Sequence, residues 1–402
     1  MKCMKNFQGK TAQDIYPFPH INLPMYPLAG EIKPSKTFTY CLMNEISRDF
    51  SASCLIPVSN GLDYLVVPSS THITELFDYY QYTYGKECVG DLTNLVFTDN
   101  QYKEVAERLA QKTGKKIISH LPYIDEKFSY FDPEKLAYLN SKNNLACLTN
   151  AIPKRVVVQS ASLKTKLSEI EFDFPVYLKG ASGIGGNYVV KLDSIEELEN
   201  HKKLLSLMSE VIIEESFDHD FNFNVQCCIS STGDISFLGF STQLISGTQH
   251  AGNCLYLNST FEELPMFVQF ITQQACQFAS SLGYYHGVVG LDILYRQKDE
   301  KAVLIDPNFR WNGSTPLNLL GDIIFKKTKP KYVFWVGFST TRYQKFSELL
   351  KTFRHHLDNG KIFIIGGLKA KKENGFFMGL GLIGNELFEI EENRKFCLEK
   401  LL

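Results

Sequence analysis

Apolar positions in the first third of the chain alternate between two spacings. Short apolar runs at residues 64–68, 95–98 and 116–119 have the composition of buried strands. Between them, residues 71–84 and 101–113 place apolar side chains three and four positions apart, which is the spacing of a helix with one buried face. Strands that alternate with helices in this way predict parallel strands joined by helical crossovers.

The middle of the chain has the patterns of antiparallel hairpins. Residues 221–229 and 234–243 are apolar runs separated by a turn at Gly233. Residues 288–294 and 302–306 form a second such pair around a polar segment. These pairs predict two hairpins.

Helices are expected before and between these hairpins. Residues 265–282 have helical spacing, and the glycine that follows is suited to end the helix. Ser194 and Glu197 have the spacing of a capping box, which predicts a helix from there to about residue 210. Residues 211–215 then read as a buried strand.

The last part of the chain again mixes the two kinds of element. Residues 361–365 and 376–382 are predicted strands, and a final helix is expected from about residue 386. We therefore divide the chain into an α/β domain at 1–132, a central α+β domain at 133–320 and a C-terminal α+β region at 321–402.

The composition fits a protein that acts on small molecules. The 402 residues include 42 Lys and Arg and 44 Asp and Glu. The charges nearly balance, so no global charge favours nucleic acid or a membrane surface. No apolar run reaches the ~18 residues that a spanning helix needs, and the start of the chain lacks a signal-peptide pattern. The ten cysteines show no CxxC spacing, which favours reduced thiols over a zinc site. We expect a cytoplasmic protein without nucleic-acid or membrane partners.

A glycine-rich turn between two predicted strands is the first candidate for chemistry. Lys179 ends one strand, and Gly180, Gly183, Gly185 and Gly186 follow before the chain returns. Glycines let backbone N–H groups crowd around phosphate oxygens, and a neighbouring lysine adds positive charge. The pattern is neither a Walker loop nor the dinucleotide fingerprint, because a strand rather than a helix comes next. By itself it fits equally well a long turn that needs positive φ angles.

Carboxylates near two predicted strand ends are the second candidate. Asp292 lies inside an apolar run, where a charged carboxylate is costly unless it is paired or bound to a metal. Asp306 ends the partner strand, and Asn308 points the same way because it is two residues further on. Such oxygen ligands suit Mg²⁺, and Arg310 could bind a transferring phosphate with two parallel hydrogen bonds. The alternative is a hairpin with ordinary polar ends, since Asp-Pro-Asn also favours a turn; the mid-strand position of Asp292 favours the metal.

The order of these motifs resembles the ATP-grasp superfamily, which includes biotin carboxylase, D-alanine–D-alanine ligase and glutathione synthetase. The resemblance covers about residues 140–316. It implies an ATP-grasp fold, in which two α+β subdomains sandwich ATP. An α/β domain precedes that fold, and a small α+β region that completes or caps the active site follows it. Residues 308–316 resemble, more narrowly, peptide ligases of the pheganomycin ligase kind.

The resemblance also implies roles for individual residues. Lys142 and Lys179 are expected at the phosphates, Glu214 at the adenine amino group, and backbone groups of residues 215–217 along the adenine edge. The expected nucleotide-binding residues are Lys142, Lys179, Gly183, Gly185, Gly186, Glu214, Glu215, Phe217 and, near the ribose, Asp220 or Asn222. The expected Mg²⁺ ligands are Asp292, Asp306 and Asn308, and the expected catalytic residues are Arg310 and Lys179.

Three departures from the family pattern stand out. Asp306 replaces the usual glutamate, and Tyr188 stands where a glycine is common. No Lys or Arg occurs between Lys203 and Arg296, although many relatives carry a base on the loop expected at residues 247–252. His250 or Gln243 is a candidate polar contact to the intermediate, although a His here is as readily an ordinary buried or exposed side chain.

The function implied is an ATP- and Mg²⁺-dependent ligase that activates a carboxylate as an acyl phosphate and joins it to an amine. Its substrates would be small molecules, such as amino acids or peptides, and a homodimer is compatible with the sequence. Two alternatives remain: an ATP-binding regulator without catalysis, and a biotin carboxylase-like enzyme that acts on bicarbonate.

Overall fold

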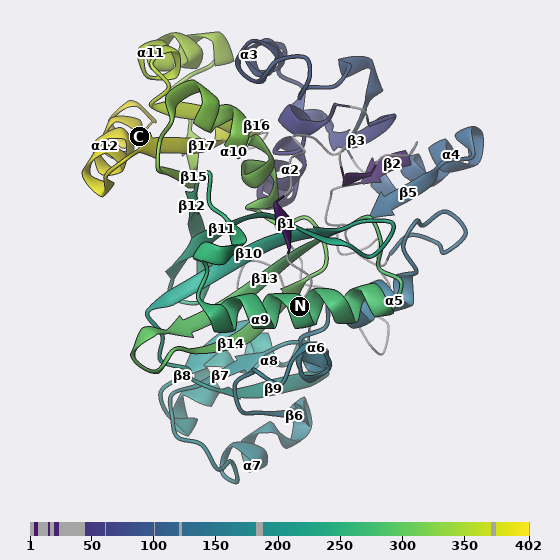
Figure 1. Cartoon of the computed structure of the whole chain (residues 1–402), viewed down its shortest axis with the longest axis vertical. Coiled ribbons are helices and arrows are strands. Elements are labelled where there is room, and N and C mark those ends of the chain that lie inside the picture. Colours follow the sequence, from purple (N-terminus) through teal and green to yellow (C-terminus); the bar gives the residue numbers. More distant parts are fainter. Residues whose placement is uncertain are drawn as a thin grey trace.

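The computed structural model describes residues 4–6, 15–16, 20–23, 45–60, 62–99, 101–119, 123–181, 188–370 and 375–401. Within these residues the strands form three sheets, of which the N-terminal sheet lies beside the upper part of the large sheet and the small sheet lies at the bottom of the view (Figure 1). The mixed α/β and α+β class expected from the sequence is confirmed.

The N-terminal sheet is parallel throughout, with the order β4-β3-β2-β5. Its strands are β2 (His20–Leu23), β3 (Tyr64–Pro68), β4 (Leu95–Thr98) and β5 (Lys116–Ser119). Helices α3 (Thr74–Tyr84) and α4 (Tyr102–Thr113) provide the crossovers, as the alternating pattern predicts. Strand β2 was not expected, because Ile21 and Leu23 alternate with polar residues and the segment lacks the adjacent apolar residues that mark the other three strands.

The small sheet is antiparallel and has the order β6-β9-β7-β8. Its strands are β6 (Arg155–Gln159), β7 (Val176–Lys179), β8 (Val189–Leu192) and β9 (Glu210–Glu215), and the short helices α7 (Leu163–Leu167) and α8 (Lys202–Leu205) accompany them. Its buried side chains form a hydrophobic cluster of their own, separate from the core that the other two sheets share.

The large sheet has nine strands among the described residues, in the order β14-β13-β10-β11-β12-β15-β17-β16, with β1 (Lys5–Asn6) beside β11. The remaining bounds are β10 (Phe221–Ile229), β11 (Ile235–Ser246), β12 (Gln249–Tyr256), β13 (Gly287–Arg296), β14 (Lys301–Asn308), β15 (Tyr332–Thr340), β16 (Ile362–Ala370) and β17 (Gly375–Gly384). Both predicted hairpins are confirmed, as β10–β11 and β13–β14. Strands β15 to β17 extend this sheet from the C-terminal region.

Helices cover the sheets and position the segments that reach the centre. The longest of those described is α9 (Met266–Ser281), which packs across β10, β13 and β14. Helix α2 (Glu45–Ser53) packs on β16 and β17, so a segment from the N-terminal part touches the far end of the large sheet. The others are α5 (Pro133–Leu139), α6 (Leu145–Leu148), α10 (Thr315–Thr328), α11 (Phe346–Asp358) and α12 (Leu387–Leu401). In the part of the chain described, every helix is too short or too polar to cross a membrane.

The predicted capping box is wrong. Residues 195–201 form a 3-10 helix followed by the single turn α8, and the side chain of Ser194 makes no cap bond to it. Glu197 instead accepts a hydrogen bond from the backbone N–H of Asp193, one residue before the expected cap. Because the donor is shifted by one residue, the motif closes a turn rather than opening an α-helix.

Candidate functional site

A cavity of about 800 Å³ lies between the small sheet and the large sheet. Strands β7 and β9 contribute to it from one side, and β11, β12, β13 and β14 from the other. Helix α2 and strands β15 and β17 close it at the far end of the large sheet. A volume of this size is in the range of small-molecule sites.

The two carboxylates predicted to bind metal face each other inside this cavity. Asp292 on β13 is the cross-strand partner of Asp306 on β14, and partners in an antiparallel pair project from the same face. Asn308 pairs with Gly290, where a side chain is excluded because a Cβ would lie 2.2 Å from the amide nitrogen of Asn312. The hairpin therefore brings both acids and the amide of Asn308 to one place.

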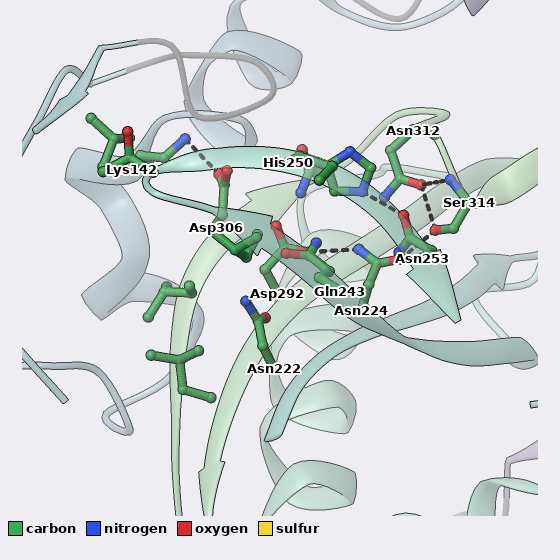
Figure 2. A pocket seen from close by; sticks show the side chains of 18 of the residues that line it. Lys142, Asn222, Asn224, Gln243, His250, Asn253, Asp292, Asp306, Asn312 and Ser314 are labelled. Atoms are coloured by element: carbon green, nitrogen blue, oxygen red, sulfur yellow. Dashed lines mark hydrogen bonds and ion pairs between the residues drawn. The ribbon is translucent and has the colours of Figure 1, made fainter. Parts of the chain in front are cut away.

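Two side-chain amide groups donate hydrogen bonds to the carboxylate of Asp292. Its Oδ1 accepts hydrogen bonds from Asn224 Nδ2 at 2.6 Å and Gln243 Nε2 at 2.8 Å (Figure 2). Burial and the neighbouring charge of Asp306 raise the pKa of Asp292 to about 7. Two carboxylates in this arrangement are disfavoured as a doubly charged pair unless a cation lies between or beside them.

Lys142 supplies one such cation. Its Nζ lies 2.7 Å from Asp306 Oδ1, and the side chain is buried (Figure 2). Its backbone N–H donates to the carbonyl of Ala181, at the start of the glycine-rich turn. Lys142 therefore connects the acid pair of the large sheet with the end of β7.

A second buried cluster lies on the small sheet around Glu214. Its Oε1 pairs with Lys179, and its Oε2 lies 2.6 Å from a guanidinium nitrogen of Arg155. Arg155 also donates to the backbone carbonyl of Lys142 at 2.6 Å. Both oxygens of Glu214 thus have partners within the protein, whereas the resemblance implies the adenine amino group as a partner.

Arg310 is held from the side by Asn140. The guanidinium of Arg310 donates to Asn140 Oδ1, and the same oxygen accepts the backbone N–H of Phe309 at 3.1 Å. Asn140 also donates a hydrogen bond from Nδ2 to the carbonyl of Phe309 at 3.3 Å. Both side chains are buried, so the direction of the guanidinium is fixed.

Most of the predicted residues line the cavity. They are Lys142, Lys179, Glu214, Glu215, Phe217, Asn222, Asp292, Asp306, Asn308 and Arg310. Asp220 does not, because its carboxylate accepts the backbone N–H of Gln297 at 2.7 Å and lies outside the lining. Of the two ribose candidates the structure brings only Asn222 to the cavity, and a ribose contact by Asp220 stays a prediction. Gly183, Gly185 and Gly186 lie outside the described residues.

Several lining residues were missed in the sequence. Tyr177, Val189, Leu294 and Ile305 provide an apolar slot beside Glu214 and Glu215. They look like ordinary strand residues in the sequence, and only the stacking of two sheets reveals their position. Arg155 and Asn140 were missed for the same reason, although each adjoins a residue or strand that was singled out.

The expected loop at residues 247–252 is a tight hairpin instead. Gly247 and Thr248 form the turn, and β12 begins at Gln249. His250 therefore sits on a strand, where its Nε2 shares a hydrogen bond with Asn253 Oδ1 and its ring stacks on Trp335 at 5.9 Å. Burial lowers the pKa of His250, which favours a neutral ring. Gln243 and His250 both line the cavity, as expected of polar contacts.

Residues 153–308 match the family model described as L-aspartate--L-methionine ligase, ATP grasp. These residues include Lys179, Glu214 and the whole acid hairpin. This part of the chain matches an ATP-grasp ligase family. Its reaction class, ATP-dependent joining of a carboxylate to an amine, agrees with the order of motifs in the sequence.

Solved structures support the fold of this ligase over most of its length. An N5-carboxyaminoimidazole ribonucleotide synthetase bound to ADP superposes with a TM-score of 0.58 at 13% identity, over 84% of this chain and 90% of that one. The biotin carboxylase domain of 2-oxoglutarate carboxylase from Hydrogenobacter thermophilus gives 0.56 at 12% identity, over 85% of each chain. An L-amino acid ligase from Bacillus licheniformis gives 0.52 at 12% identity, over 83% of this chain and 96% of that one.

Proposed function

We propose that this ATP-grasp ligase joins two amino acids, activating the carboxylate of one as an acyl phosphate for attack by the amine of the other. The observation that supports the proposal is that the small sheet and the large sheet line one cavity from opposite sides. Lys179, Arg155 and Glu214 lie on the small sheet, and the pair Asp292–Asp306 lies opposite on the large sheet. The matched family, named for aspartate and methionine, supports amino acids as the substrate class.

The acid hairpin fits Mg²⁺. Asp292, Asp306 and Asn308 offer oxygen ligands, which this ion prefers. Among the described residues no three His, Cys, Asp or Glu side chains cluster into a complete metal site, so the phosphates of ATP would supply the remaining ligands. When bound, Mg²⁺ would neutralise phosphate charge and the repulsion that raises the pKa of Asp292.

The protein's own cations have separate tasks in this proposal. Lys142 and Lys179 contact phosphate oxygens, and Arg155 keeps the carboxylate of Glu214 in place. A substrate carboxylate oxygen attacks the γ-phosphorus and ADP leaves. The amine nitrogen then attacks the carbonyl carbon of the acyl phosphate, inorganic phosphate leaves, and the nitrogen loses a proton.

Arg310 is assigned to the second step. Its guanidinium is held by Asn140 and lines the cavity two residues beyond Asn308. A fixed donor is suited to the oxyanion that forms when the amine adds to the carbonyl. Exclusion of water by the cavity would protect the acyl phosphate from hydrolysis.

The decisive test is product formation by the purified chain with ATP, Mg²⁺ and pairs of amino acids, beginning with aspartate and methionine. We expect ADP release that requires both amino acids, together with a product whose mass equals their sum less one water. Equal amounts of ADP and product would establish ligation. ADP release with one amino acid and no condensed product would refute it.

The same assay separates the two alternatives. ATP turnover that depends on bicarbonate and needs no amine would identify a carboxylase. Tight ATP binding without phosphate release across a broad panel of amines and carboxylates would identify a regulator. Because both alternatives use the same nucleotide site, ATP binding alone does not discriminate among the three functions.

A further inference from the structure

The end of the cavity farthest from the acid hairpin has no task in the reaction described so far. It is lined by Phe50, Cys54, Leu55, Trp335, Gly337 and Phe377, which we call the aromatic end. Strand β15 is four places from β13 in the large sheet, and neighbouring strands lie about 4.8 Å apart, so the two ends are separated by roughly 19 Å along the sheet.

A row of side chains on one face of the sheet connects the two ends. Gln243, which bonds to Asp292, pairs with Asn253, and Asn253 pairs with Trp335. Cross-strand partners project from the same face, so polar side chains lead from the acid pair to the indole. The aromatic end therefore belongs to the same cavity as the chemistry.

Glycines form the floor of the aromatic end. Gly337 pairs with Gly379, and Gly379 pairs with Gly366, so three adjacent strands each have a glycine in one transverse row. A Cβ on Gly379 would lie 2.4 Å from the Phe50 ring, and one on Gly337 would lie 2.8 Å from the Phe377 ring. The row allows aromatic rings to lie directly on the backbone of the sheet.

The rings pack against one another over this floor. Phe50 stacks on Trp335 with centroids 5.8 Å apart and meets Phe377 edge-on at 4.9 Å. The six residues that define the aromatic end carry no formal charge. Such a surface offers mainly dispersion and apolar contact to a ligand, and these six residues supply no cation to hold a carboxylate or a phosphate.

We infer that the aromatic end is a side-chain pocket for one of the two amino-acid substrates and takes a large apolar or aromatic side chain. Gly337 and Phe377 set the depth of this pocket. Gly337 has no side chain, and the ring of Phe377 lies in the space that a side chain there would fill. This inference rests on the proposed ligation of amino acids. It adds that side-chain selection occurs far from the nucleotide, against rings carried by α2, β15 and β17.

Binding can be measured without turnover. The chain has two tryptophans, Trp311 and Trp335, and both line the cavity, so amino-acid titrations in the presence of ADP and Mg²⁺ can be followed by tryptophan fluorescence. We expect norleucine and phenylalanine to bind about tenfold or more tightly than alanine or glutamine. Equal binding across this panel, or no binding of norleucine and phenylalanine, would overturn the pocket.

Two substitutions should change the selectivity in opposite directions. Gly337→Ala narrows the pocket and should weaken norleucine about tenfold relative to alanine. Phe377→Leu deepens it and should shift the preference toward phenylalanine. The matched control is Phe376→Leu, because Phe376 lies next in the strand, packs on Phe346 at 5.2 Å and is absent from the cavity lining.

The controls keep this inference separate from the proposed function. ADP affinity, measured by calorimetry, should be unchanged in all three variants, which shows that the nucleotide end is intact. Selective norleucine binding with no amide product would sustain the pocket and refute the ligase. The opposite result would be amide formation at the same rate for every side chain, with the same selectivity in Gly337→Ala and Phe377→Leu as in Phe376→Leu. That result would sustain the ligase and refute the pocket.

Discussion

The small sheet and the large sheet face the same cavity but are built differently. The small sheet has four strands and its own hydrophobic cluster, and it presents Lys179 and Arg155 around one glutamate. The large sheet shares its core with the N-terminal sheet and presents Asp292 and Asp306. Substitutions on either wall should therefore lower turnover, whereas only those on the small sheet should also weaken nucleotide affinity.

The largest expected effect is on turnover, from Lys179→Ala and Asp306→Ala. Each removes a charged group proposed to act on the phosphates, and we expect substrate-dependent ADP release to fall about 1000-fold in each. Lys179→Ala should also weaken ATP binding, because it removes a phosphate contact from the small sheet. Circular dichroism and calorimetry with ATP check that the fold survives and that the two variants differ in affinity.

The matched control for these variants is Lys191→Ala. Lys191 lies on β8 of the same small sheet, is exposed and pairs with Asp193 at 2.6 Å. Its turnover should match that of the unmodified chain. Retained turnover in both Lys179→Ala and Asp306→Ala would contradict the assignment of both walls.

The next effect is on stability, from Arg155→Ala. This change leaves the buried carboxylate of Glu214 with one partner in place of two and removes the bond to the carbonyl of Lys142. Removing one partner of a buried pair should cost about 3 kcal/mol of unfolding free energy. Urea unfolding measures it, and Arg354→Ala, at an exposed pair with Asp358, should leave the urea midpoint unchanged. A midpoint for Arg155→Ala as high as that of the control would show that the pair is not stabilising.

The sequence predicted the acid hairpin well because its signal is local. Asp292 stands in an apolar strand and Asp306 ends the next, so pairing of two adjacent strands suffices to bring them together. The partners of Glu214 could not be predicted in this way. Arg155 lies 59 residues away, and its meeting with Glu214 depends on the register of β6 and β9, which no pattern within either strand specifies.

The fold shows the same division between local and distant signals. The parallel crossovers and both predicted hairpins follow from periodicity and turn residues. The aromatic end does not, because Phe50 comes from α2, whereas Trp335 and Phe377 come from strands nearly 300 residues later, as the positions themselves show. The glycines of β15, β16 and β17 were visible in the sequence, but their alignment in one row requires the register of three strands.

A smaller effect is the pH dependence of the nucleotide-free protein. Burial raises the pKa of Asp292 from 3.8 to about 7, so the folded state holds this proton over a range in which the unfolded state has lost it. The stabilisation is therefore complete at low pH and is lost as the pH rises through 7. Relative to Asp292→Asn, the unmodified chain should lose about 2 kcal/mol between pH 5 and 8. Urea unfolding with EDTA at both pH values measures this loss, and parallel pH profiles would refute it.

The smallest effect tests the backbone beside the glycine-rich turn. Tyr188 has a φ of 58°, a left-handed conformation that disfavours any residue with a Cβ and suits the glycine common at this position in the superfamily. Its ring also packs on the small-sheet cluster, so Tyr188→Gly alone would mix relief of strain with loss of packing. Comparison of Tyr188→Gly with Tyr188→Ala removes the packing difference, since both lack the ring. We expect the glycine variant to be the more stable by about 1 kcal/mol in urea unfolding, the reverse of the usual order in strands. If alanine is the more stable, the left-handed backbone at this position does not persist in solution.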